Sequence, residues 1–276
     1  NEPYIEIVSI SENSMFVSKR AKTYDEEKQV ATKVPINGII INDLNKKKSI
    51  NQKMTSKNLN IVNWDNVFKH SKTFQDGKPV KWVFVEDFFV NDFYEKLYET
   101  YPKKDDSWRF VSSEDKSAYR KEWGTRKPGG VSIDEEDTNF SKSWNQFYHY
   151  LFSNEFISNM KKFSNVPINK VKIFDFMILT KGGYQQPHIH NSGPSTVIMM
   201  LYFNKNWKKG EPGGTYITLE EDESKMIFEP YNLNNSSIIF HDGPQAGHGV
   251  RYVSKDVERR AIQIYLEEYS PETGWN

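Results

Sequence analysis

Three histidines lie where β-strands are expected to meet loops, and together they could hold one metal ion. His188 and His190 are separated by a single residue, and His248 lies in a glycine-rich segment further along the chain. Side chains alternate along an extended segment, so His188 and His190 face the same side with their Cα atoms about 7 Å apart. Imidazole binds iron, zinc and copper, and a site with open positions suits oxygen chemistry. The pattern predicts a metal site.

The composition narrows the chemistry. The chain has no cysteine, which excludes disulfides, thiolate metal sites and cysteine nucleophiles. Its 37 basic and 37 acidic side chains cancel, so no global field recruits nucleic acid or an anionic membrane. No stretch approaches the roughly 18 apolar residues of a membrane span, and the start lacks a signal-peptide pattern. We expect a soluble, cytoplasmic protein without a nucleic-acid or membrane partner, and the oligomeric state is left open.

The first 75 residues are predicted to form a polar extension of short strands and loops. The sequence leaves the structure of this extension uncertain. The character changes at residues 81–86, a β-branched and aromatic segment that predicts a strand. Helical spacing of apolar residues follows over 92–101, until Pro102 ends it. A second helical stretch covers 141–163, with a break expected near residues 153 and 154. We therefore expect one catalytic domain over residues 76–276.

Beyond residue 166 the apolar period changes to two, and turn-forming residues separate short segments. This pattern is typical of an antiparallel sandwich or barrel. Because the helices precede the strands, we expect an α+β, mainly β fold with helices packed on one sheet. The expected strands are 171–180, 196–203, 214–219, 225–229, 236–240, 248–253 and 259–266.

The order of the motifs resembles a known family. A Gly-Gly turn at 182–183 precedes the His-Ile-His segment, and Leu-Tyr-Phe-Asn follows at 201–204. Trp207, a second Gly-Gly, the distal His248 and then Arg-Arg-Ala-Ile complete the series. Over about residues 81–267 the chain resembles the iron(II)/2-oxoglutarate-dependent dioxygenase superfamily, in particular its prolyl 4-hydroxylase-like branch. The resemblance implies a double-stranded β-helix core, a jelly-roll or cupin-like fold.

The resemblance also implies the roles of individual residues. His188 and His248 correspond to the first and distal ligands of Fe(II). Tyr202 is similar to the tyrosine whose hydroxyl reaches the far carboxylate of 2-oxoglutarate, the co-substrate. Arg259 resembles the arginine that pairs with this carboxylate through its planar fork. Arg260 is the competing choice, because strand alternation allows only one of the two to point inward.

His190 departs from the family pattern, which has a carboxylate at this position. In one interpretation His190 binds the iron and completes a three-histidine site. In a second it turns away and leaves two protein ligands, and in a third the metal lies elsewhere. Halogenating relatives carry a small residue there to admit a halide, a space that a histidine would fill. His241 and Asp175 are further candidates for the pocket.

The leading functional hypothesis is hydroxylation of an unactivated substrate carbon, with decarboxylation of 2-oxoglutarate to succinate. One alternative is a cupin-like three-histidine oxygenase that uses no 2-oxoglutarate. This alternative gives Arg259 and Tyr202 no function. Another is a catalytically degenerate binding module of the same fold. The aromatic and basic segment 107–130 resembles a substrate-covering loop in its placement, and it is compatible with a small-molecule, sugar-like or peptide substrate.

Overall fold

The structure of the protein is a computed structural model with two compact units, residues 1–59 and 60–276. It describes residues 60–123, 136–190 and 193–268, together with three strands near the N-terminus. These strands form an antiparallel sheet in the order β1 (Tyr4–Ser11), β2 (Ser14–Arg20) and β3 (Val30–Pro35). The apolar run at 38–41 lies outside the described residues.

The second unit begins with two short helices, α2 (Trp64–Lys69) and α3 (Ser71–Asp76). The expectation of strands and loops is therefore wrong for this segment. Each helix buries one large apolar side chain, Val67 or Phe74, and Phe74 packs on Phe163 with ring centroids 5.1 Å apart. Each helix has only six residues, so the apolar spacing of Trp64, Val67 and Phe68 in α2 covers less than two turns and gives no extended helical period.

Three longer helices follow, α4 (Asn91–Glu99), α5 (Lys142–Leu151) and α6 (Asn154–Ser164). The predicted break is confirmed, because the Ser153 hydroxyl accepts a hydrogen bond from the Phe156 N–H and begins α6 anew. Asn165, in a left-handed conformation, ends that helix. Among the described residues, the helices are all too short or too polar to cross a bilayer.

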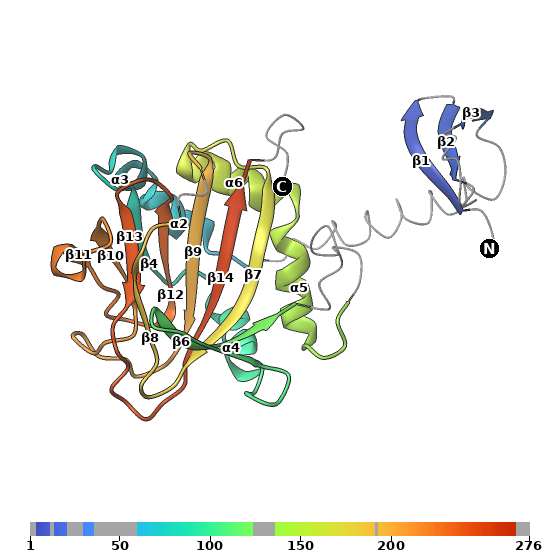
Figure 1. The fold of residues 1–276 in the computed structure, drawn as a ribbon. Helices are drawn as coiled ribbons and strands as arrows, with labels where there is room; N and C mark the ends of the chain where they lie inside the picture. Colours follow the sequence, from blue (N-terminus) through green and yellow to red (C-terminus); the bar gives the residue numbers. More distant parts are fainter. Residues whose placement is uncertain are drawn as a thin grey trace. The chain divides into compact units, whose positions relative to one another are not determined.

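One curled antiparallel sheet contains the remaining strands (Figure 1). Its order is β11-β10-β13-β8-β6-β7-β14-β9-β12-β4, and β5 pairs with β6 outside this path. The strands are β4 (Trp82–Glu86), β5 (Arg109–Ser112), β6 (Lys116–Glu122), β7 (Lys170–Leu179), β8 (Tyr184–His188), β9 (Thr196–Phe203), β10 (Thr215–Leu219), β11 (Met226–Phe228), β12 (Asn234–His241), β13 (Ala246–Val250) and β14 (Arg259–Glu267), with the short 3₁₀ helix η1 (Glu223–Lys225) before β11.

Two apolar clusters lie on opposite faces of the larger half of this sheet. Along β9, Met199 and Leu201 pack in the cluster that includes the helices, whereas Ile198 and Met200 pack in the inner cluster. This alternation is the period of two that the sequence shows. The larger half, β4-β12-β9-β14-β7-β6, thus carries helices outside and faces β8-β13-β10-β11 inside. This arrangement is the predicted α+β, mainly β fold.

Strand β6 links the two halves of the sheet. Its residues 119–122 pair with β7, and its residues 116–117 pair with β8. The strands β5 and β6 were not predicted, because their segment was interpreted as a substrate-covering loop. Two of its aromatics belong to the core instead: Trp108 and Trp123 are buried, and Trp123 stacks on Tyr148 with centroids 4.2 Å apart. Residues 124–135 lie outside the described residues.

Candidate metal centre

His188 and His248 face each other across two neighbouring strands. His188 ends β8 and pairs directly with His248 in the middle of β13. The two glycines beside His248 let β13 pack closely against its neighbours. A Cβ at Gly247 would overlap the Glu220 carbonyl oxygen, and one at Gly249 would lie 2.5 Å from the Tyr216 hydroxyl. Cross-strand partners have Cβ atoms about 4.5–5.5 Å apart, so both imidazoles reach a common point.

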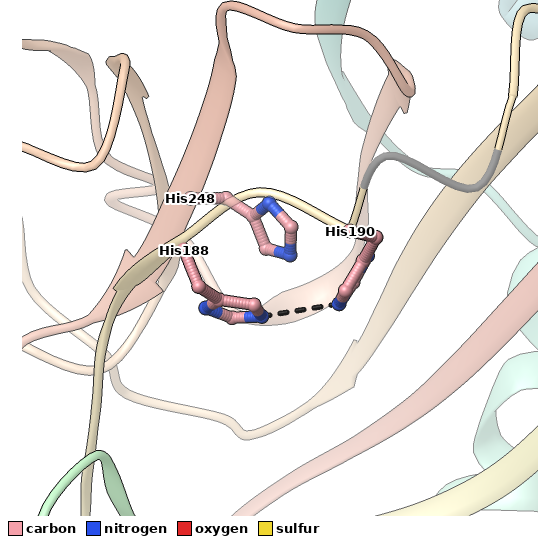
Figure 2. Close-up of side chains that lie close together, drawn as sticks. All are labelled: His188, His190 and His248. Atoms are coloured by element: carbon pink, nitrogen blue, oxygen red, sulfur yellow. Dashed lines mark hydrogen bonds between the residues drawn. The ribbon is translucent and has the colours of Figure 1, made fainter.

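His190, just beyond the end of β8, turns toward this pair (Figure 2). Its Nε2 lies 3.1 Å from Nε2 of His188. One ligand nitrogen from each of the three histidines lies within 4.8 Å of the others. Imidazole–metal bonds are about 2.0–2.1 Å long, so small side-chain movements would bring the three nitrogens onto one ion. The structure thus brings together the three residues that the sequence singled out.

Backbone carbonyls orient two of the rings. Nδ1 of His188 lies 2.9 Å from the Gln186 carbonyl, and Nδ1 of His248 lies 3.3 Å from the Ala246 carbonyl. An Nδ1–H that donates to a carbonyl leaves the lone pair on Nε2, which is the tautomer that binds a metal through Nε2. Nε2 of His248 is buried without a hydrogen-bond partner among the described residues. A metal would satisfy this nitrogen.

A tyrosine and two glutamines complete the surroundings of the histidines. The Tyr265 hydroxyl lies 2.9 Å from Nε2 and 3.0 Å from Nδ1 of His190, and it accepts a hydrogen bond from the Gln263 amide at 3.1 Å. The Gln185 amide lies 3.1 Å from Nε2 of His188. These three side chains were not among the predicted site residues. Strand alternation could have found two of them, since Gln263 and Tyr265 share a face of β14 with Arg259.

Burial keeps the three imidazoles neutral. It lowers the pKa of His248 well below the usual value, and neighbouring His188 and His190 lower it further. Burial and the adjacent His188 lower the pKa of His190 to about 4. The pKa of His188 is lowered by burial as well. Neutral imidazole is the form that binds metals, so the site is ready for an ion at neutral pH.

Arg259 is fully buried and crosses from β14 to the opposite half of the sheet. Its Nε donates to the Gly213 carbonyl at 2.7 Å, and its Nη2 donates to the Thr215 hydroxyl at 3.0 Å. The Tyr202 ring lies 5.0 Å from the guanidinium carbon, and the Tyr202 hydroxyl accepts from the Thr215 N–H at 2.9 Å. Nη1 of Arg259 is buried without a partner among the described residues. A guanidinium held in this way leaves both N–H groups of Nη1 for an anion.

Pairing in the sheet places this guanidinium close to the histidines. Thr215, its partner on β10, pairs with Val250, and Ile217 pairs with His248. Two residues along a strand correspond to about 7 Å. A short dicarboxylate with one end at the metal could therefore meet Arg259 with the other.

The other candidates lie elsewhere or play other parts. Arg260 bonds to Glu258 through Nε at 3.1 Å and Nη2 at 2.8 Å, and its guanidinium lies over the Tyr101 ring on the helix-covered side of β14. Nε2 of His241 lies 2.6 Å from the Pro194 carbonyl, apart from the three histidines. Asp175 is buried on β7, and its carboxylate lies 3.4 Å from Nη1 of Arg120.

Comparison with known proteins bears on the fold. No family model and no curated protein sequence matches the chain. Among solved structures, a Pseudomonas putida prolyl-4-hydroxylase is similar with a TM-score of 0.52 and 12% identity, over 72% of this chain and 99% of that one. A 2OG-Fe(II) oxygenase family oxidoreductase from Burkholderia pseudomallei has a TM-score of 0.50 and 10% identity, over 75% of this chain and 91% of that one.

The chain shares the double-stranded β-helix fold of these oxygenases. At this level the resemblance predicted from the motifs is confirmed. The coverage of nearly the whole prolyl-4-hydroxylase means that the shared fold is a complete domain. At identities of 12% and 10%, the structural similarity shows the fold but not the reaction. The reaction has to be argued from the side chains.

Proposed function

We propose that the protein is a non-haem Fe(II)- and 2-oxoglutarate-dependent oxygenase that hydroxylates an unactivated carbon of its substrate. The observation that supports this most strongly is the buried Arg259, whose Nη1 has no partner among the described residues. Its partner Thr215 lies two residues along β10 from Ile217, which pairs with His248 of the three clustered histidines. An unpaired buried guanidinium N–H is costly. A carboxylate at this position would satisfy it.

The residues of the site suit both iron and 2-oxoglutarate. His188, His190 and His248 would hold the iron through neutral imidazoles, a nitrogen donor set that suits Fe(II). Arg259 would bind the far carboxylate of 2-oxoglutarate, and the Tyr202 hydroxyl, which accepts from Thr215, keeps its own proton to donate to the same group. Bound together, iron and 2-oxoglutarate supply oxygen activation, with decarboxylation of the co-substrate to succinate. The protein supplies orientation and a water-poor environment.

A site with three neutral ligands differs electrostatically from one with a carboxylate ligand. The full charge of the divalent ion stays uncompensated until an anion arrives. We therefore expect the protein to bind 2-oxoglutarate much more tightly with the metal than without it. The Tyr265 hydroxyl contacts His190, and it can hold the orientation of this ring without adding charge to the site.

The alternatives make different demands. A cupin-like three-histidine oxygenase without co-substrate accounts for the histidines, but it gives no reason for a buried, partly unpaired Arg259 beside Tyr202. A degenerate binding module accounts for neither the contacts of two rings with backbone carbonyls nor the buried Nε2 of His248, which has no partner among the described residues. We propose the co-substrate-dependent enzyme because it uses all of these features.

The decisive assay supplies purified protein with Fe(II), 2-oxoglutarate and oxygen and measures succinate. We expect iron-dependent succinate release even without the true substrate, at the slow rate of uncoupled turnover. Oxygen consumption without succinate would favour the cupin-like alternative. Binding of iron without any turnover, in the presence of 2-oxoglutarate, would favour the degenerate module.

A pair of neighbouring variants tests the co-substrate site. Arg259→Gln should weaken binding of 2-oxoglutarate to the metal-loaded protein at least tenfold, because a charge-assisted pair is lost. Arg260→Gln is the matched control and should leave binding unchanged, since Arg260 pairs with Glu258 on the other face of the strand. Calorimetric titration measures both. The opposite result would show that the assigned inward face of β14 is wrong.

A further inference from the structure

A second cationic group lies beside the histidines and has no part in the proposed co-substrate site. The even-numbered residues of β6 face the interior, as the burial of Ala118 in the inner apolar cluster shows. Lys116 and Arg120 flank Ala118 at the alternate positions and therefore share this face. Lys116 pairs in register with Gln185, whose amide contacts His188. The strand thus brings Lys116 beside the strand that carries His188, and Arg120 follows on the same face.

The Arg120 side chain is largely buried yet only partly bonded. Its Nη1 makes a long contact of 3.4 Å with Asp175, and its side chain is 16% exposed. Its Nε is buried with no hydrogen-bond partner among the described residues. The Nε side of a guanidinium carries two parallel N–H groups that match the two oxygens of a carboxylate. This side of Arg120 has the geometry of an anion site.

Contacts between side chains link Arg120 to the histidines. Its partner Asp175 pairs with Gln263 on the neighbouring strand β14. The Gln263 amide donates to the Tyr265 hydroxyl, which contacts His190. Asp175 offsets part of the charge of Arg120. The Arg120 guanidinium therefore lies on the same inner face of the sheet as the residues that surround His190.

Arg120 is distinct from the Arg259 site. Arg120 pairs with Met177 on β7, and Met177 pairs with Ala261, two residues from Arg259 on β14. Two strand spacings and two residues along a strand separate the Cα atoms of Arg120 and Arg259 by about 12 Å. The Arg120 side chain reaches Asp175, which lies a further two residues from the row of Arg259. One short dicarboxylate that is held by Arg259 and the metal cannot also fill the Nε side of Arg120. A different carboxylate is needed there.

We infer that Lys116 and Arg120 form a substrate-binding site, which holds a carboxylate group of the substrate beside the three histidines. This inference rests on the proposed function, because it treats the histidines as the reacting centre. A carboxylate bound by Arg120 would place the neighbouring carbon atoms of the substrate near the metal. The substrate class is then a carboxylic acid, such as an amino acid or a sugar acid, and not a neutral sugar.

The test uses acetate as the probe and acetamide as its neutral match. The full-length protein is loaded with Mn(II) and 2-oxoglutarate, and uptake of both is measured first. Failure of this loading would count against the proposed function alone. The paramagnetic relaxation of each probe's methyl protons is then measured. We expect faster relaxation of acetate than of acetamide, because acetate is held near the ion.

Variants show which residues cause the difference in relaxation between acetate and acetamide. Arg120→Gln should remove at least four fifths of the difference between the two probes, and Lys116→Gln should reduce it. Arg260→Gln should leave it unchanged. Equal relaxation of acetate and acetamide in the wild type, or a full acetate effect in Arg120→Gln, would overturn the inference.

A second measurement does not depend on the metal. Acetate titrated into ¹⁵N-labelled, metal-free protein should shift the Arg120 Nε–H signal, and acetamide should not. The signal is assigned by its loss in Arg120→Gln. No shift with acetate would overturn the anion site, whatever the metal does.

Discussion

At the scale of single residues, the unusual feature is a third histidine that a tyrosine supports. The Tyr265 hydroxyl lies 2.9 Å from Nε2 and 3.0 Å from Nδ1 of His190 and accepts from Gln263, so it contacts the edge of the ring between the two nitrogens. Groups that orient metal ligands typically affect metal affinity by about 10- to 100-fold. Tyr265 acts through His190, which makes it a positioning residue.

We therefore expect Tyr265→Phe to weaken Co(II) binding about tenfold while the thermal unfolding of the metal-free protein changes little. Competition with a chelator measures the affinity, and the Co(II) absorption spectrum reports the ligand geometry. Tyr184→Phe is the control, because that hydroxyl bonds only to loop carbonyls at residues 113 and 114 in the described structure. An unchanged spectrum and affinity in Tyr265→Phe would contradict the positioning role.

Depressed histidine pKa values also predict a pH dependence. Unfolded His190 takes up a proton below a pH of about 6.5, whereas in the folded metal-free protein its pKa is about 4. Between these values the unfolded state binds more protons, so acidification destabilises the fold. The loss from this group is at most about 1.4 kcal/mol per pH unit.

The check compares the metal-free wild type with His190→Gln by urea unfolding between pH 7 and pH 4.5. We expect the wild type to lose more stability than the variant as the pH falls. Parallel curves would mean that His190 is not buried as a neutral ring.

At the scale of secondary structure elements, the sequence predicted most strands of the β-helix. Period-two alternation predicted the strands that correspond to β7, β9, β12 and β14 closely, because each has one face on the helices and one face inside the barrel. It failed for β5 and β6, where arginines, lysines and serines dominate, and for β8, where two glutamines and a proline hide the alternation. Strands β5 and β6 form because β7 offers an edge to pair with, which local composition does not reveal.

The same limit applies to the site. The spacing of His188, His190 and His248 was visible, but the contact of Tyr265 with His190 joins β14 to a loop 75 residues earlier. Such pairs depend on the curl of the sheet. Arg120 was part of the aromatic and basic segment that resembled a substrate-covering loop, and its inward direction follows from a strand pairing that was not predicted.

Strand β13 depends on glycine for its close packing. A Cβ at Gly247 would overlap the Glu220 carbonyl. We expect Gly247→Ala to destabilise the protein by about 1–3 kcal/mol or more, as overpacking does, and to lower metal affinity because the neighbouring His248 shifts. Gly243→Ala is the control, because open space surrounds that position among the described residues. Thermal unfolding of the two variants compares them, and equal melting temperatures would contradict this packing.

At the scale of the whole molecule, the compact unit that holds the site begins at residue 60. The sequence predicted a boundary near residue 75, but Val67 and Phe74 in α2 and α3 are fully buried. Removing large buried side chains costs several kcal/mol each. The two short helices therefore belong to the oxygenase-like fold.

Two truncations test this boundary. We expect residues 60–276 to fold with nearly the melting temperature of the full chain and to bind metal equally well. A chain that starts at residue 77 should be strongly destabilised. Circular dichroism and chelator competition measure both properties. Equal stability of the two truncated chains would place the boundary later, where the sequence analysis expected it.

The most direct test of the account measures metal affinity with His190→Ala and His241→Ala side by side. Wild type should bind one Fe(II) or Co(II) per chain, and His190→Ala should weaken binding at least 100-fold, because one of three protein ligands is lost. His241→Ala should bind as the wild type does, since its ring contacts the Pro194 carbonyl away from the centre. Full affinity in His190→Ala would contradict the three-histidine centre on which the proposed function rests.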